Sequence, residues 1–115
     1  IQFNQTGVYY ISFTVNAYAK HSGAAFDPET DFVSIAFREI DSDNILAAVN
    51  GMSYNECAMN MTGQGMFVVA DIATAYELVN TQKKSIYLNG CNVLKTVSNS
   101  YFAVPMVTMS IIKLM

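Results

Sequence analysis

Ionic side chains are scarce in this 115-residue sequence, which contains 6 Lys and Arg, 9 Asp and Glu, and has a net charge of −3. Charged residues make up 13% of the chain and hydrophobic residues 52%, whereas about a quarter of the residues of a typical globular protein are charged. The surface of a solitary monomer would therefore be poorly supplied with ionic groups, which favours an oligomer.

Basic clusters are also missing, since Lys83 and Lys84 form the only pair of adjacent cations. Without a basic patch, nothing attracts phosphate backbones or anionic lipid headgroups, so we expect no nucleic-acid partner. No apolar run reaches the roughly 20 residues that span a bilayer, so we expect no membrane insertion. The N-terminus lacks the pattern of a signal peptide, and Ile1 in place of an initiator Met favours a fragment of a longer chain.

Reactive side chains are few. His21 is the only histidine, and no acid and nucleophile accompany it in a catalytic pattern, so a surface role is favoured over a catalytic one. Cys57 and Cys91 lie neither in a CxxC motif nor beside a histidine. They could pair as a disulfide or stay as buried thiols, and both alternatives remain open. We therefore expect no enzyme, no cofactor and no metal site.

Two acidic stretches are the remaining candidates for a calcium site, and they contain Asp27, Glu29 and Asp31, and Asp41, Asp43 and Asn44. Oxygen ligands at such spacing could hold calcium, but the glycine and the terminal Glu of a known calcium loop are missing. Solvated turns are therefore favoured.

The clearest pattern in the chain is a strand over residues 6–18, "TGVYYISFTVNAY". Its odd-numbered positions are apolar, from Tyr9 to Ala17, and its even-numbered positions are Val8, Tyr10, Ser12, Thr14, Asn16 and Tyr18. A strand that faces water on one side alternates cleanly between apolar and polar residues. Because the second face here is partly apolar and partly small hydroxyl, we expect it to meet another protein surface.

Further strands are predicted over residues 32–40, 45–49, 66–72, 75–79 and 101–115, with Pro105 at the start or edge of the last one. Residues 50–65 are predicted to be a connection, and a small ribbon is expected around Asn89-Gly90. No helix is convincing, although residues 70–79 could form a helical turn or two by propensity. Six or seven strands in one domain are typical of a sandwich or jelly roll.

Three segments resemble the complement (C-one-q)/tumour necrosis factor jelly-roll superfamily. "GVYYISFTV" is similar to its glycine-aromatic strand, "FVVADIATAYELV" to a later strand pair, and "MSIIKLM" to its central C-terminal strand. Within the superfamily the sequence most resembles the BclA-type head domain of collagen-like spore-surface glycoproteins and related phage fibre heads. In these heads an E/Q-T-G-x-Y turn opens the same strand, and here the turn reads Gln5-Thr6-Gly7-Val8-Tyr9. The resemblance covers residues 1–20 and 64–115. Ala75-Tyr76 replaces the family's Gly-Asp turn, and the family's first strands are absent, so they lie upstream or the domain is a shortened variant.

The resemblance implies an all-β, antiparallel two-sheet jelly-roll sandwich, with residues 1–115 as a single head domain that forms a trimer. In such jelly rolls the inner sheet packs one face on the outer sheet and the other on a three-fold axis. This implies an interior of Tyr9, Ile11, Phe13, Met66, Val68, Ala70, Ile72, Met109 and Ile111. It implies a trimer interface of Val8, Tyr10, Ser12, Phe67, Val69, Thr108, Ser110, Ile112 and Leu114. The alternative is that the residues assigned to the trimer interface belong instead to the thick core of a monomer.

The function implied by the resemblance is that of a structural and adhesive head, which trimerises and caps a fibre on the extracellular surface of a spore (its exosporium) or a virion. Its partners would be two further copies of the chain, with a protein or glycan receptor as a further candidate. The alternative is a secreted cytokine-like or complement-like ligand that binds a protein receptor between protomers.

Overall fold

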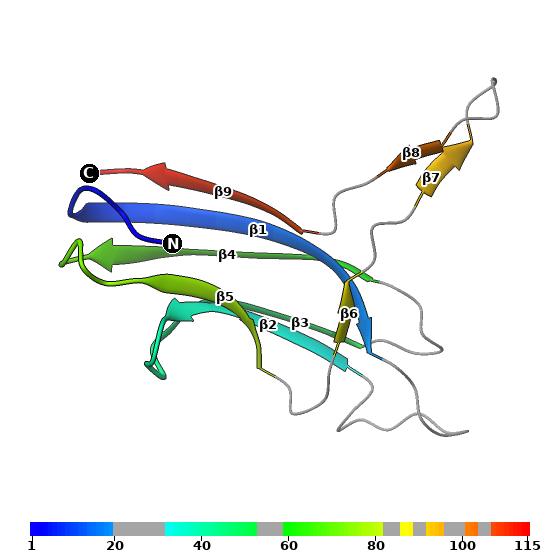
Figure 1. Ribbon diagram of the computed structural model, residues 1–115, viewed down its shortest axis with the longest axis horizontal. Coiled ribbons are helices and arrows are strands. Elements are labelled where there is room, and N and C mark those ends of the chain that lie inside the picture. Colours follow the sequence, from blue (N-terminus) through cyan, green and yellow to red (C-terminus); the bar gives the residue numbers. More distant parts are fainter. Residues whose placement is uncertain (20–31, 53–58, 82–85, 89–91, 96–100, 104–106) are drawn as a thin grey trace.

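The computed structural model describes residues 1–19, 32–52, 59–81, 86–88, 92–95, 101–103 and 107–115, and its regular elements there are all strands (Figure 1). These strands are β1 (Gly7–Ala19), β2 (Phe32–Glu39), β3 (Ile45–Met52), β4 (Met59–Val69), β5 (Tyr76–Asn80), β6 (Ile86–Leu88), β7 (Asn92–Lys95), β8 (Tyr101–Ala103) and β9 (Val107–Lys113). The predicted all-β class is confirmed. Within these ranges there is also no helix long and apolar enough to cross a membrane.

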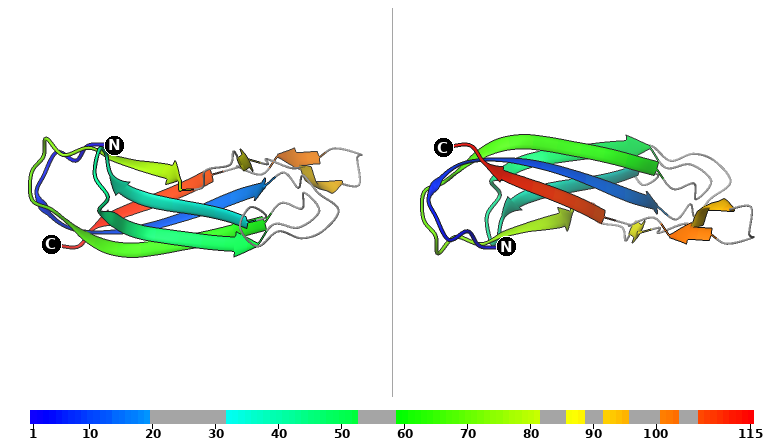
Figure 2. Two further views of the ribbon diagram at one scale, coloured as in Figure 1. Left: turned by 90° about the horizontal axis from the view of Figure 1, so that it is seen from below. Right: turned by 90° about the horizontal axis from the view of Figure 1, so that it is seen from above.

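Two antiparallel sheets pack face to face, as in a β-sandwich (Figures 1 and 2). In the first sheet, β1 pairs with β4 along one edge and with β9 and then β6 along the other. The second sheet has the order β3-β2-β5, and β7 and β8 form a separate two-stranded ribbon. Both chain termini lie at the same end of the sandwich (Figure 2).

Strand β1 supplies much of the core because its odd-numbered side chains all point toward the second sheet. Ile11, Phe13 and Val15 are almost completely buried, as are Val33 and Phe37 of β2. Each such side chain contributes about 1.5–3 kcal/mol when it leaves water. The predicted interior positions of Tyr9, Ile11 and Phe13 are therefore confirmed.

An aromatic cluster fills the end of the core nearest the termini. The ring of Phe3 lies 4.5 Å from that of Tyr9 and 5.4 Å from that of Tyr76, and the rings of Phe37 and Tyr76 stack at 5.7 Å. The backbone of Ile1 exchanges two hydrogen bonds of 2.8 Å with the backbone of Tyr76. These bonds hold the N-terminal segment over the cluster.

Strand β3 continues to Met52 and β4 begins at Met59, so the prediction of a connection over residues 50–65 is wrong at both ends, and residues 53–58 lie outside the described part of the chain. Gly63 and Gly65 occupy core-facing positions of this strand, opposite Phe13 and Ile11 of β1. A Cβ on Gly63 would overlap the Phe13 ring, and a Cβ on Gly65 would lie 2.7 Å from the carbonyl oxygen of Leu46. Glycine is used here for close packing, which removes the apolar signal of a strand from the sequence.

The facing of β4 also differs from the prediction. Phe67 and Val69, which were expected at a subunit contact, are core residues that are 5% and 1% exposed. Met66 and Val68, which were expected inside, are 67% and 64% exposed, and Ala70 and Ile72 are exposed as well. Residues 66–69 are all apolar, so an alternating pattern cannot show which of them face the core. The core-facing positions of Gly63 and Gly65 show it, because Phe67 and Val69 follow them at the same spacing of two.

Two other predictions about the C-terminal part are corrected. A small ribbon was expected around Asn89-Gly90, but these two residues lie outside the described part of the chain, and the described strands on either side pair elsewhere, β6 with β1 and β7 with β8. The expected single strand over residues 101–115 is divided into β8 and β9, and Pro105 lies outside the described residues. The other predicted strands are found as β2, β3 and β5, and no helical turn is assigned over the described residues 70–79.

Candidate functional site

The candidate site is the face of the β4-β1-β9 sheet that points away from the second sheet, hereafter the outer face. Since successive side chains of a strand point to opposite faces, the outer face carries the residues that alternate with the core positions. Its described members are Val8, Tyr10, Ser12, Thr14, Asn16, Asn60, Thr62, Gln64, Met66, Val68, Thr108, Ser110, Ile112 and Leu114.

The register of the three strands groups these residues into rows across the sheet. Val8 lies opposite Val68, and its carbonyl oxygen accepts a 2.7 Å hydrogen bond from the N–H of Leu114. The next row is Met66, Tyr10 and Ile112. These two rows form the apolar zone of the outer face, at the end of the sheet where β1 begins.

The apolar zone is open to solvent in the single chain. The exposed fractions are 67% for Met66, 64% for Val68, 54% for Ile112 and 47% for Leu114. Single exposed apolar side chains are ordinary, but adjacent ones on neighbouring strands form a patch of the kind that marks protein contacts.

The remaining rows form the polar zone, which consists of hydroxyl and amide side chains. Its rows are Gln64, Ser12 and Ser110, then Thr62, Thr14 and Thr108, and then Asn60 and Asn16. The Tyr10 hydroxyl reaches this zone and donates a 2.6 Å hydrogen bond to Oε1 of Gln64, and the hydroxyls of Thr14 and Thr62 are 3.1 Å apart. Hydroxyl and amide groups both donate and accept, so such a surface can bond to a copy of itself.

No described member of the outer face is Asp, Glu, Lys, Arg or His. The nearest cation along the chain is Lys113, whose Nζ donates a 2.9 Å hydrogen bond to Oε1 of Gln5. Arg38 and Glu77, which form an ion pair of 2.8 Å, belong to the second sheet. The outer face is therefore uncharged across all three strands.

The structure brings most of the predicted interface residues together on the outer face, namely Val8, Tyr10, Ser12, Thr108, Ser110, Ile112 and Leu114. Phe67 and Val69 are not among them, because they lie in the core. Sequence reasoning missed Met66 and Val68, which occupy the positions beside Tyr10 and Val8. The alternating glycines at 63 and 65, taken as core positions, are the signal that would have placed them correctly.

The other predicted candidates do not add to a site. His21, Cys57, Cys91, Asp27, Glu29 and Asp31 lie outside the described residues. Asp41 and Asp43 are exposed in the turn between β2 and β3. In the described part of the chain, no three His, Cys, Asp or Glu side chains lie close enough together to hold a metal ion.

Comparison with known proteins leaves the outer face as the main guide to function. No protein-family model, curated protein or solved structure matches the chain. We therefore infer the function from the chemistry of this face and from the resemblance in the sequence.

Proposed function

We propose that this chain is the trimeric head domain of a fibrous surface protein, in which three copies pack through their outer faces. The observation that carries the proposal is a sheet face without charge whose apolar zone is exposed in the single chain. The segments similar to the complement and tumour necrosis factor jelly rolls support the same arrangement, and the jelly-roll form of the sandwich is part of the proposal.

The outer face suits contact with its own copies for two reasons. It has no charges, so identical faces meet without the like-charge repulsion that makes most surfaces avoid themselves. Its hydroxyl and amide groups can pair with the same groups of another copy, while the apolar zone leaves water. The number three comes from the sequence resemblance, because the face alone would fit any closed symmetric assembly.

The head would align the three chains of a stalk and cap it on the outer surface of a spore or virion. It would also contact a protein or glycan receptor there. This part of the proposal rests on the resemblance to BclA-type and phage fibre heads. The structural part rests on the outer face and can be tested separately.

Ile112 and Ile45 provide a matched test of the assembly. Ile112 is 54% exposed on the outer face, and Ile45 is 53% exposed on β3 of the other sheet. We expect Ile112→Asp to dissociate the trimer, because three carboxylates would be buried near one axis without partners. We expect Ile45→Asp to remain trimeric, since its carboxylate stays in water.

Sedimentation equilibrium at several concentrations measures the mass, and circular dichroism checks that each variant is folded. The unsubstituted chain should have three times the mass of the 12.7 kDa protomer. A stable 12.7 kDa species at micromolar concentration, or an Ile112→Asp variant that stays trimeric with an unchanged melting temperature, would show that the outer face is not the assembly surface.

A further inference from the structure

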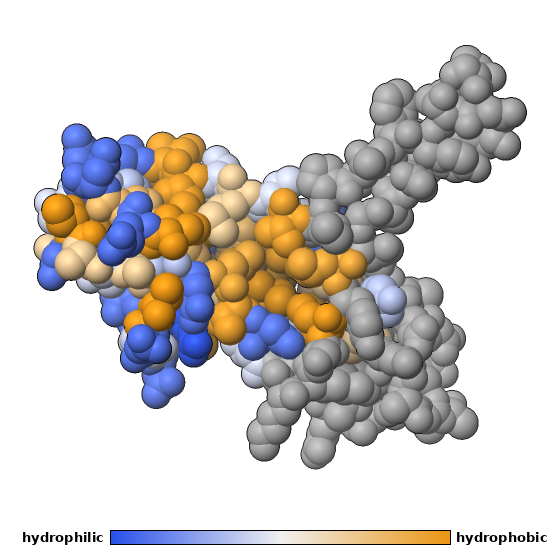
Figure 3. All heavy atoms as spheres, viewed as in Figure 1, coloured by the Kyte–Doolittle hydropathy of each residue, from blue (hydrophilic) through white to orange (hydrophobic). Residues whose placement is uncertain are grey.

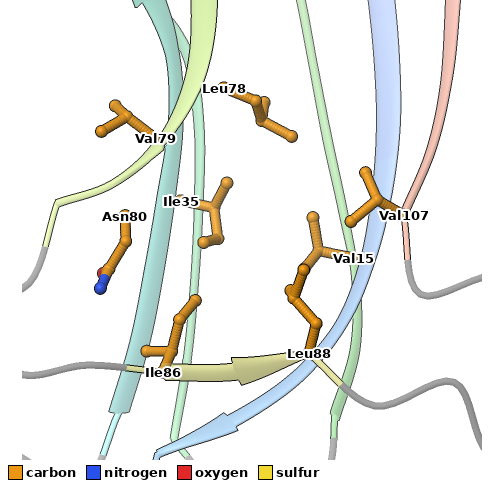
Figure 4. Close-up of a pocket in the computed structure, with 8 residues that line it drawn as sticks. All are labelled: Val15, Ile35, Leu78, Val79, Asn80, Ile86, Leu88 and Val107. Carbon is orange, nitrogen blue, oxygen red and sulfur yellow. The ribbon is translucent and has the colours of Figure 1, made fainter.

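An apolar cleft opens between the two sheets, on the side where β5 and β9 are the edge strands. It has a volume of about 490 Å³, and its lining consists of seven aliphatic side chains and Asn80. Figure 4 shows Ile35 and Leu78 on one wall facing Val15 and Val107 on the other, and Figure 3 shows apolar surface gathered in the middle of this side. On the opposite side of the sandwich, β3 and β4 approach each other closely.

The cleft exists because the core-facing side chains become smaller along the sandwich. On β1 they decrease from Phe13 to Val15 and then to Ala17. On β5 the buried Tyr76 belongs to the aromatic cluster, whereas the next core position is the aliphatic Leu78. Rings therefore fill the end of the core nearest the termini, and smaller side chains leave space beyond them. Protein interiors rarely contain voids larger than a water molecule, so a space of this size is a distinct feature of this sandwich.

The cleft has a buried floor and an exposed rim. Val15 and Ile35 are almost completely buried and form the floor, whereas Leu88 and Val107 are exposed and form part of the rim. Strand β6 pairs with the end of β1, and Figure 4 shows its residues Ile86 and Leu88 bounding the cleft there. A molecule in the cleft would therefore bury one part against the floor, while its other end reaches solvent at the rim.

The chemistry of the lining selects the kind of ligand. Among the described residues, none of those that line the cleft is charged or aromatic. A charged group on the floor would be buried without a partner, which is costly, and a ring would find no other ring to stack on. Cavities with apolar walls bind apolar molecules, and pockets for small molecules have volumes of about 300–1,000 Å³. The cleft therefore suits a saturated hydrocarbon chain.

We propose that the cleft is a binding site for a single-chain aliphatic molecule that ends in a polar group. The chain lies on Val15 and Ile35 of the floor, and the polar end stays in water at the rim beside Leu88 and Val107. Burial of the chain supplies the binding energy, because apolar surface of both the ligand and the cleft leaves water. No residue of the outer face lines the cleft, so this inference does not rest on the proposed function.

A series of straight-chain alcohols from hexanol to decanol tests the proposal by calorimetric titration of the 115-residue chain. The affinity should rise about fourfold for each added CH₂ group, because each group leaves water as it enters the cleft. In NMR spectra, the chain protons of decanol should show nuclear Overhauser effects to the methyl groups of Val15 and Ile35. An affinity that does not increase with chain length, or decanol that shows no such effect to either residue, would overturn the proposal. Light scattering records the mass of the same samples, so a failure of the proposed trimer is detected separately.

Val107→Asp and Ile45→Asp form a matched pair of variants, since both residues are exposed but only Val107 lines the cleft. Val107→Asp should weaken decanol binding by about tenfold or more, because the entering chain would remove water from the new carboxylate. Ile45→Asp should change it by less than about twofold. Leu88→Asp repeats the test from β6, and circular dichroism checks that each variant is folded. Equal decanol affinities of folded cleft variants and Ile45→Asp would show that the alcohol binds elsewhere.

Discussion

Gly63 is a point of close packing between β1 and β4. Its missing side chain leaves the space that the Phe13 ring occupies. We expect Gly63→Ala to lower the free energy of unfolding by about 1–3 kcal/mol, because the added methyl group forces the ring or the backbone to move. Urea denaturation measures this change.

Asp43→Ala is the control for Gly63→Ala, since Asp43 is exposed in the turn between β2 and β3 and lies outside the outer face. A surface substitution of this kind should change the free energy of unfolding by less than about 0.5 kcal/mol. Equal stabilities of the Gly63→Ala variant and the unsubstituted chain would mean that the ring does not fill this space.

Tyr76 makes the stability of the protein depend on alkaline pH. Burial raises the pKa of its phenol above 10.0, and the nearby carboxylates of Glu39 and Asp71 raise this pKa further. The unfolded chain releases the phenol proton near pH 10, while the folded chain keeps it to higher pH. The folded state then binds more protons, so the free energy of unfolding is unaffected below this window and falls as pH rises through it.

Tyr76→Phe should remove this part of the alkaline loss, because phenylalanine has no proton to release. Chemical denaturation at about pH 8, below the ordinary tyrosine pKa, and at about pH 10.5, above it, gives the free energy of unfolding that each chain loses between the two. We expect a smaller loss in the Tyr76→Phe variant than in the unsubstituted chain. If both lose the same stability over this interval, the Tyr76 phenol is not the group that titrates.

Among the elements, β1 is the strand whose position and facing could be predicted from the sequence alone. Its odd-numbered side chains are apolar and buried from Tyr9 to Ala19, and they are bulky as far as Val15. In β9 the family resemblance, and not the pattern alone, placed Ile111 toward the core and Ile112 away from it, and the structure has them on these faces. Alternation in β1 indicates burial directly, because its core positions from Tyr9 to Val15 carry large side chains.

Strand β4 could not be predicted in the same way, because two of its core positions have no side chain. Gly63 and Gly65 are read as turn residues in a sequence, whereas here they accommodate Phe13 and the approach of β3. Because these two core positions carry no apolar side chain, the sequence did not show which face of β4 is buried, and the predicted facing of Phe67 and Val69 was the reverse of the observed one. The error in the candidate site thus came from the core, and the residues of β1 and β9 were placed correctly on the outer face.

Pairing between distant strands is the other feature that local pattern did not predict. A turn signal such as Asn89-Gly90 indicates that adjacent strands form a hairpin. In this protein β6 instead pairs with the end of β1, where Ala17 lies opposite Leu88. The choice of partner depends on packing over the whole sandwich, which a short segment of sequence does not contain.

At the scale of the whole molecule, the uncharged outer face predicts how assembly depends on salt. Charged interfaces weaken as ionic strength rises, because dissolved ions screen the attraction between charges over a Debye length of about 10 Å at 0.1 M. We expect the dissociation constant of the proposed trimer to change by less than about threefold between about 0.05 and 1 M NaCl, since no charge pair forms at its centre. Sedimentation equilibrium across this range provides the measurement. Weakening by tenfold or more would indicate that charged residues outside the outer face make the contact.

The pairing of β1 with β9 also determines when the fold can be completed during synthesis. Tyr9 lies opposite Lys113, so one edge of the first strand finds its partner only in the last few residues of the sequence. At roughly 5–20 residues per second, the ribosome needs on the order of 10 s to make the chain between them. During that time the β9 edge of β1 stays unpaired, and the newly made chain must avoid associating with its neighbours through that edge until β9 has been made.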